Sequence, residues 1–143
     1  MSLRLSILPG RLAVCRLAPS EAAPAWAAGA DFFSITRTPE ELSVVCLEAQ
    51  VPDGVRAEKG WRGLRVEGPL DFALIGILAG LAGALAQAGI SLFALSTFDT
   101  DYLLVREPDL PEAVKALERA GYVVEGNVRK GSSRSSKFFI PLV

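Results

Sequence analysis

Residues 72–98 read FALIGILAGLAGALAQAGISLFALSTF, a run without a single charged side chain, bounded by Asp71 and Asp99. About 20 apolar residues are enough to span a bilayer, and Gly76 and Gly80 have the GxxxG spacing of packed membrane helices. Membrane spans, however, are commonly flanked by lysine and arginine, and this run is flanked by aspartate. The sequence therefore favours a buried segment of a globular domain over a membrane anchor.

The composition of the run changes at Gly89. Before it, leucine, alanine and glycine predominate; after it, β-branched and aromatic residues alternate with small or polar ones. Glycine commonly ends a helix because it tolerates positive φ. We therefore expect a helix over residues 71–88, with Asp71 as its N-cap, followed by a buried strand over residues 90–97.

The elements around this run complete a familiar order. Strands are expected at Trp61–Glu67, Tyr102–Arg106 and Tyr122–Glu125. A second helix is expected between the last two strands: Asp109 and Glu112 have capping-box spacing at its start, and Gly121 ends it. The order β-α-β-β-α-β predicts the α+β fold class and a ferredoxin-like domain, with two helices on one face of an antiparallel sheet.

The first half contains a fainter copy of this unit. FFSITRTPEELSVV (Phe32–Val45) aligns without a gap with LFALSTFDTDYLLV (Leu92–Val105) at an offset of sixty residues, which indicates a repeated strand-turn-strand. LAVCRL is the expected first strand of the copy, APAWAAGA a shortened helix, and VPDGVRAEKG a loop by composition. A strand at Leu3–Leu8 is expected to fill the place of the missing second helix.

These observations divide the chain into three parts. We expect a degenerate N-terminal half over residues 1–60, a C-terminal domain over residues 61–127 and a tail over residues 128–143. The tail is polar and low in complexity, which is typical of a linker or a disordered segment. Its apolar end, FFIPLV, is either an edge strand or an added remnant.

The composition argues against several function classes. The chain has no histidine, so that Ser-His and Cys-His nucleophile pairs and imidazole metal ligands are excluded; we expect no enzyme activity, cofactor or metal. The net charge of −1 gives no electrostatic basis for binding nucleic acid. Cys15 and Cys46 lie in apolar runs and are expected to be buried thiols. No signal-like segment starts the chain, which predicts a cytoplasmic protein.

The motifs WRGLRVEGPLDF and STFDTDYLLV resemble the ACT domain, a βαββαβ module that binds amino acids and regulates metabolic enzymes. Together with FFSITRTPEELSVVC, they resemble a group of small bacterial proteins built from two tandem ACT-like halves, similar to aspartate-kinase regulatory domains and to the animal cytosolic arginine sensor. The resemblance covers about residues 3–126. It implies a small-molecule sensor that binds an amino acid or related metabolite and acts on a regulated enzyme. Because the exposed edges of such sheets invite pairing, we also expect a homodimer.

The resemblance also implies where the ligand lies. The segment that contacts the amino acid in the arginine sensor corresponds here to Thr97, Phe98, Asp99, Thr100 and Asp101. The start of the helix after the first strand corresponds to Asp71, Phe72, Gly76 and Ile77, and the equivalent positions in the first half are Ser34, Thr36 and Thr38. Where the sensor has an acidic residue for a guanidinium, this chain has Leu74 or Ile75, which argues against arginine as the ligand.

The chemistry of these residue types suits an amino acid. The unpaired N–H groups at a helix start attract a carboxylate, and Asp101 or Asp99 would accept hydrogen bonds from the ammonium. Each assignment has a structural alternative: the aspartates are common turn residues, Asp71 is a common type of N-cap, and Phe98 is equally well a core residue. The alternative function is a protein-interaction subunit without a small ligand.

Overall fold

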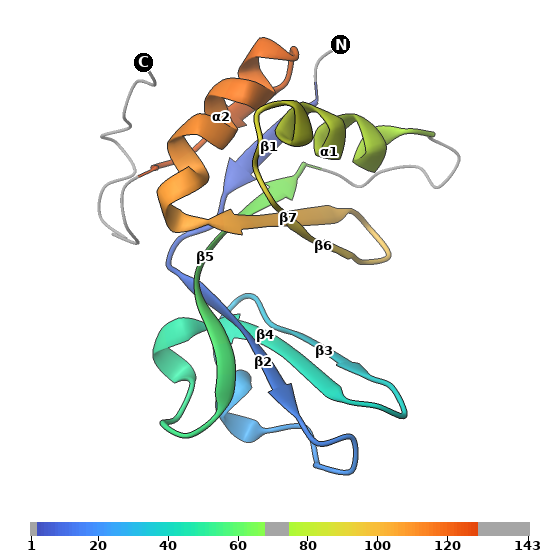
Figure 1. Ribbon diagram of the computed structural model, residues 1–143, viewed down its shortest axis with the longest axis vertical. Coiled ribbons are helices and arrows are strands. Elements are labelled where there is room, and N and C mark those ends of the chain that lie inside the picture. The colour runs from blue at the N-terminus through green and yellow to red at the C-terminus, as the bar shows by residue number, and fades with distance from the viewer. Residues whose placement is uncertain (1–2, 68–74, 129–143) are drawn as a thin grey trace. The chain divides into compact units, whose positions relative to one another are not determined.

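The computed structural model describes residues 3–67 and 75–128, and these form two compact units (Figure 1). Residues 10–61 form one unit, here called the inserted unit. The chain before residue 10 and the chain from residue 62 onward form the other, here called the composite unit. The strand β5 (Arg56–Val66) begins in the inserted unit and ends in the composite unit.

The composite unit has the predicted β-α-β-β-α-β order. After the end of β5 come α1 (Ile77–Gln87), β6 (Phe93–Ser96), β7 (Asp101–Arg106), α2 (Leu110–Arg119) and β8 (Val123–Glu125). Both helices pack on the same sheet face, because alternate strand residues share one core with them. That core contains Leu5, Leu64, Val66, Leu81, Leu85, Ile90, Leu103, Val105, Leu110, Ala113, Val114 and Leu117. The predicted α+β class is confirmed.

The strand β1 (Arg4–Ile7) lies between β5 and β8 in the composite unit. It pairs antiparallel with β5, Leu5 opposite Val66, and parallel with β8, Leu5 opposite Val124. Leu5 is fully buried in the core. The expectation that this strand completes the N-terminal copy is wrong, and β1 and β8 form a parallel pair. Because Leu5 alternates with the polar Arg4 and Ser6, β1 has one apolar face, which the composite core buries.

The helix α1 is shorter than predicted, because it begins at Ile77 and not at residue 71. Gly76 precedes it with a left-handed φ of 81°, which interrupts helical geometry. The predicted N-cap, Asp71, lies outside the described residues. The predicted end at Gly89 is confirmed: its φ is 75°, and Ile90 N–H donates to Leu85 O at 3.0 Å, as in a Schellman motif.

No helix in the described ranges has the length and hydropathy that crossing a membrane requires. The helix α1 is only 11 residues long, and the apolar run continues into the separate strand β6.

The predicted capping box of the second helix does not form. A 3₁₀ turn over Glu107–Asp109 leads directly into α2, so that Asp109 already has helical φ and ψ and its side chain makes no capping bond. An N-cap residue normally has extended geometry that aims its side chain at the first turn. The preceding 3₁₀ turn replaces that arrangement.

The inserted unit is a four-stranded antiparallel sheet with the order β3-β4-β2-β5. Its strands are β2 (Leu12–Leu17), β3 (Ser34–Arg37), β4 (Leu42–Leu47) and the first part of β5. Its expected short helix is a single 3₁₀ turn, Ala25–Ala27, and a second turn covers Glu48–Gln50. The segment predicted as a loop is partly strand, since pairing of Arg56 with Arg16 extends β5 backward into it.

The two cysteines are free thiols buried in the core of the inserted unit, as predicted. Burial raises the pKa of both thiols, that of Cys46 to about 11. A thiol with a raised pKa is a poor nucleophile at neutral pH, so these residues act as small core side chains.

The repeat is real, but its offset is 59 residues and not sixty. Ser34 pairs with Val45 in one hairpin, and Phe93 pairs with Leu104 in the other. Three buried residues in succession follow the same offset, from Val44, Val45 and Cys46 to Leu103, Leu104 and Val105. A slip of one residue moves every side chain to the opposite face of a strand, so the letter-by-letter alignment placed the copies out of register.

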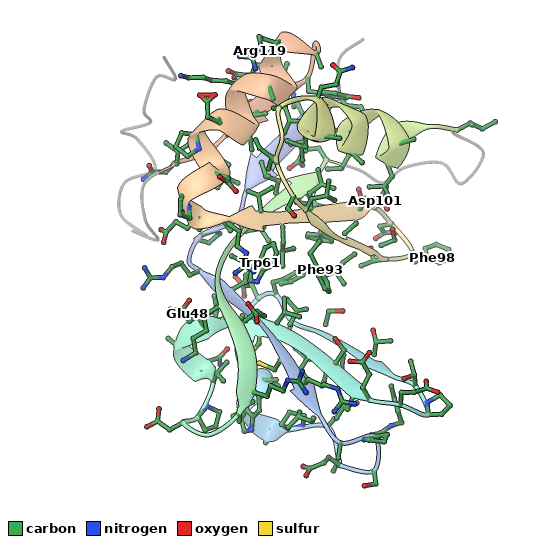
Figure 2. All side chains as sticks on the ribbon, viewed as in Figure 1. Glu48, Trp61, Phe93, Phe98, Asp101 and Arg119 are labelled. Carbon is green, nitrogen blue, oxygen red and sulfur yellow. The ribbon has the colours of Figure 1, made fainter. Side chains whose placement is uncertain are left out.

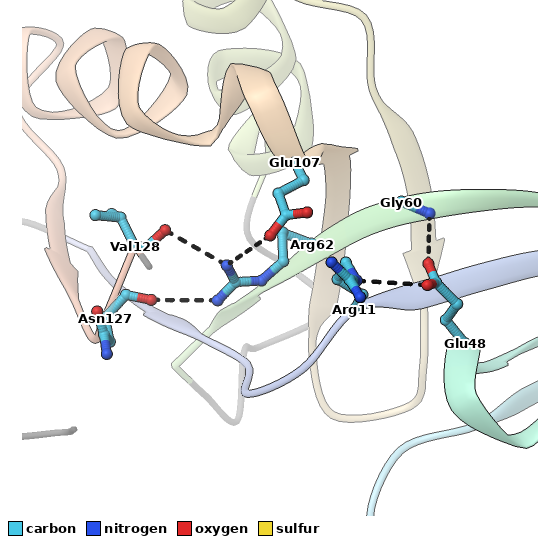
Figure 3. Close-up of polar contacts among 7 residues, drawn as sticks. All are labelled: Arg11, Glu48, Gly60, Arg62, Glu107, Asn127 and Val128. Carbon is cyan, nitrogen blue, oxygen red and sulfur yellow. Dashed lines mark hydrogen bonds and ion pairs between the residues drawn. The ribbon is translucent and has the colours of Figure 1, made fainter. Parts of the chain in front are cut away.

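Two equivalent glutamates, 59 residues apart, follow the hairpins (Figure 3). In the inserted unit, Glu48 accepts the N–H of Gly60 at 2.9 Å and pairs with Arg11 at 3.4 Å. In the composite unit, Glu107 lies 4.0 Å from Nη1 of Arg62.

The buried Arg62 also donates to two main-chain carbonyls after β8, those of Asn127 at 3.2 Å and Val128 at 3.4 Å. A buried guanidinium requires such acceptors, because an uncompensated charge in a core is costly. Arg62 therefore fixes the path of the chain beyond β8.

Replacing Gly80 with alanine should reduce stability, whereas the same change at Gly83 should increase it. A Cβ at Gly80 would lie 2.7 Å from the Tyr122 hydroxyl, and a Cβ at Gly83 would meet nothing within 4 Å. Alanine in a helix interior is favoured over glycine by roughly 0.5–1 kcal/mol. We expect Gly83→Ala to gain about that amount in urea unfolding and Gly80→Ala to fall below the wild type. Equal stability of the two variants would contradict the contact.

Candidate functional site

The turn between β6 and β7 carries the predicted ligand-binding motif. Thr97 closes it by donating its N–H to Thr100 O at 2.8 Å, and the Thr97 hydroxyl accepts the Thr100 N–H at 3.2 Å. The equivalent turn of the inserted unit repeats both bonds between Thr38 and Glu41, at 2.9 and 3.2 Å. A threonine at the first position thus closes both turns by bonding to the main chain of the residue three positions later.

Thr100 attaches the turn to the end of β5. Its hydroxyl donates to Val66 O at 2.6 Å, and the residue is only 3% exposed. Val66 is the last residue of β5. The side chain of Thr100 therefore positions the turn through an internal bond.

Asp101 and Asp99 have different surroundings. Asp101 is half-buried and accepts a bond from the Ser96 hydroxyl at 2.6 Å, across the last pair of the hairpin. Asp99 is exposed at the tip. Phe98 is 80% exposed and points away from the ribbon in Figure 2, so the alternative that it is a core residue is wrong. The carboxylate with a fixed orientation is that of Asp101.

The start of α1 offers main-chain donors. Gly76 occupies the N-cap position, and the first intrahelical bond runs from Gly80 N–H to Gly76 O at 2.8 Å. The N–H groups of Ile77 and the next residues therefore lack helical acceptors, and no side chain in the described structure caps them. In Figure 1 this helix start and the β6–β7 turn lie toward the same side of the composite unit.

The remaining predicted residues lie either outside the described residues or in the inserted unit. Asp71 and Phe72 lie outside the described residues. Ser34 and Thr36 are on β3, and Thr38 opens the following turn, so that all three belong to the inserted unit. Ser34 and Thr36 are considered again below, with the sheet of the inserted unit.

A polar network continues from the end of β5. Arg65 Nη1 lies 3.1 Å from Glu67 Oε1, and the Ser6 hydroxyl donates to the other carboxylate oxygen. The hydrogen bond with Tyr102, and secondarily the charge of Glu67, raises the pKa of Arg65. The bond from Ser6, followed by the charge of Arg65, lowers the pKa of Glu67. The arrangement fixes two opposite charges beside the β7 strand.

Sequence reasoning missed Ser96 and Val66. Ser96 is two residues before Phe98 in the motif, and only the hairpin register shows that it faces Asp101. Val66 contributes a carbonyl group, for which no side-chain pattern exists. Within the described ranges, no group of three or more histidine, cysteine, aspartate or glutamate residues is arranged to hold a metal ion.

The architecture agrees with comparisons to known protein families and solved structures. A family model for the ACT domain matches residues 56–119, and a second model, for an N-terminal domain, matches residues 10–54. The solved structure of protein Atu0741 from Agrobacterium tumefaciens is 44% identical, with a TM-score of 0.82, over 87% of this chain and 92% of that one. The chain belongs to the ACT-domain family.

Two further relatives carry functional names. The human cytosolic arginine sensor for mTORC1 subunit 1 is 43% identical over 60 residues, which are 41% of this chain and 18% of the sensor. The chain thus matches less than a fifth of that protein's length. The regulatory subunit of aspartate kinase from Thermus thermophilus is similar in fold, with a TM-score of 0.57 and 10% identity over 80% of this chain and 97% of that one.

Replacing Thr100 with valine should destabilise the fold by about 1–3 kcal/mol, because the buried Val66 carbonyl loses its donor while the side-chain volume is kept. The same change at exposed Thr36 serves as the control and should stay within about 0.5 kcal/mol. Denaturant unfolding measures both. A Thr100→Val protein as stable as Thr36→Val would show that the bond does not hold the turn.

The lowered pKa of Glu67 should appear in an NMR titration of its side-chain carboxyl carbon. Since the pKa in the folded state lies below that in the unfolded state, the network's contribution to stability is present above the unfolded pKa and is lost as pH falls through the folded pKa. Ser6→Ala should move the pKa upward. Ser43→Ala, in the inserted unit, should leave it unchanged, and equal titrations in both variants would refute the assigned cause.

Proposed function

We propose that this chain is a non-enzymatic regulatory module that binds an amino acid at the β6–β7 turn and the start of α1. The observation that carries the proposal is the fixed turn itself: Thr100 holds it to the end of β5, and Ser96 orients the Asp101 carboxylate. Membership of the ACT-domain family supports a regulatory role, and the names of the arginine sensor and of the aspartate-kinase regulatory subunit point in the same direction.

The two charged groups of an amino acid have complementary partners in this part of the unit. The ligand carboxylate would accept hydrogen bonds from the free N–H groups that follow Gly76, where the helix dipole also favours negative charge. The ammonium would donate to the Asp101 oxygen that Ser96 does not occupy. A charge-assisted bond of this kind contributes about 1.5–3 kcal/mol.

The ligand side chain is proposed to be uncharged. The sequence from residue 72 to residue 98 has no charged side chain to pair with a guanidinium or an ammonium group. Ile75, directly before the helix start, is 93% exposed, and Phe98 is 80% exposed. These two side chains flank the two segments of the proposed site, where an apolar ligand side chain would cover part of their exposed surface.

A thermal-shift screen of the twenty amino acids tests the proposal. A ligand at 100 times its dissociation constant should stabilise the fold by about 2.7 kcal/mol, and we expect apolar amino acids to do so before arginine. Asp101→Asn should weaken binding roughly tenfold or more in calorimetry, because asparagine keeps the shape of the side chain and the bond from Ser96 but loses the charge.

Asp53→Asn is the matched control, since it removes the same charge from an exposed position in the inserted unit. It should bind as the wild type does. If no amino acid shifts the melting temperature at millimolar concentration, the proposal fails. Co-purification of a stoichiometric protein would then favour the alternative of a protein-interaction subunit.

A further inference from the structure

The sheet of the inserted unit has one face in its core and one face outside it. The core face carries Ala13, Cys15, Val44 and Cys46. Because side chains alternate along a strand, the residues between these positions point to the opposite face, which we call the outer face. Thr36 and Ser34 of the predicted site both belong to this outer face.

One row of the outer face crosses all four strands. The strand register places Arg56 opposite Arg16, Arg16 opposite Ser43, and Ser43 opposite Thr36. Directly opposed residues have Cβ atoms about 4.5–5.5 Å apart. The row therefore presents two guanidinium side chains followed by two hydroxyl side chains, on strands that lie side by side in Figure 1.

The two arginines lack the acidic partners that would balance them. Like charges directly opposite each other destabilise a sheet. The guanidinium of Arg16 donates to a main-chain carbonyl, Glu40 O, at 2.8 Å. Within residues 3–67 and 75–128, neither Arg16 nor Arg56 forms an ion pair with a carboxylate. Both side chains are exposed, so a mobile anion can reach them.

We propose that this row binds the oxyanion of a small metabolite, a carboxylate or a phosphate group. The planar fork of each guanidinium donates paired hydrogen bonds to such a group, and one anion between Arg16 and Arg56 removes their repulsion. The hydroxyls of Ser43 and Thr36 are further donors along the same row. All four residues belong to the inserted unit, whereas the residues of the proposed amino-acid site belong to the composite unit.

The neighbouring row limits what can bind. It places Glu58 opposite Val14, with Val45 and Ser34 completing the row. The carboxylate of Glu58 repels a second anionic group there, whereas the half-buried Val14 offers apolar contact. The expected ligand carries one compact oxyanion at the arginine end and an uncharged body that extends toward Val14.

The proposal is tested by NMR titration of the full-length chain, once with sodium phosphate and once with sodium acetate. The ionic strength is kept constant with sodium chloride. We expect saturable shifts of the amides of Arg16, Ser43 and Arg56 with at least one of the two probes. Arg16→Gln and Arg56→Gln should each weaken the affinity about tenfold. Saturation with phosphate alone identifies a phosphate ligand, and saturation with acetate identifies a carboxylate ligand.

Two controls make the outcome decisive. Arg119→Gln removes the same charge from an exposed position in the composite unit and should leave the affinity unchanged. Glu58→Gln should strengthen binding, since it removes the nearby negative charge. Non-saturating shifts with both probes, or equal weakening by Arg119→Gln and Arg16→Gln, would overturn the proposal; well-dispersed spectra of the variants show that each remains folded.

Discussion

The structure depends on one strand, β5, which supplies hydrogen-bonding partners to both units. Its first residues pair with β2, and Leu64 to Val66 pair with β1. Within the pairing with β2 the register shifts, and Gly60 adopts a φ of 82° that other residues rarely tolerate. Glu48 fixes the Gly60 N–H in that conformation. The strands of both units thus pair with the same backbone element, and a change in the register of β5 would alter the pairing in both units.

Much of the fold could be predicted from the sequence, because side-chain periodicity reports burial. The β-α-β-β-α-β order, the helix end at Gly89 and the buried cysteines all follow from local patterns. Two features could not be predicted in this way. The strand β1 has the same alternating pattern wherever it pairs, so sequence does not choose its sheet. Consecutive apolar residues in β4 and β7 match at either of two offsets, so that only pairing fixes their register.

The candidate site was predictable in its residue types but not in its internal bonds. The motif correctly marked the turn from Thr97 to Asp101 as a defined structure, yet it did not separate residues that build the turn from residues that face solvent. Thr100 is buried and bonded to a carbonyl, whereas its neighbour Asp99 is exposed. That distinction depends on which face of the sheet each residue occupies, and this is decided by tertiary pairing with β5.

The position of β1 has a consequence for how the chain folds. During synthesis β1 must wait for β5 and β8, which follow it by more than fifty and more than one hundred residues. Closing such long loops costs entropy before any contact forms, so topologies of this kind fold slowly. The inserted unit, whose pairings are closer in sequence, can form while β1 is still unpaired. An ACT domain cut from this chain at residue 62 would lack a central strand, and its β8 would have no partner in the sheet.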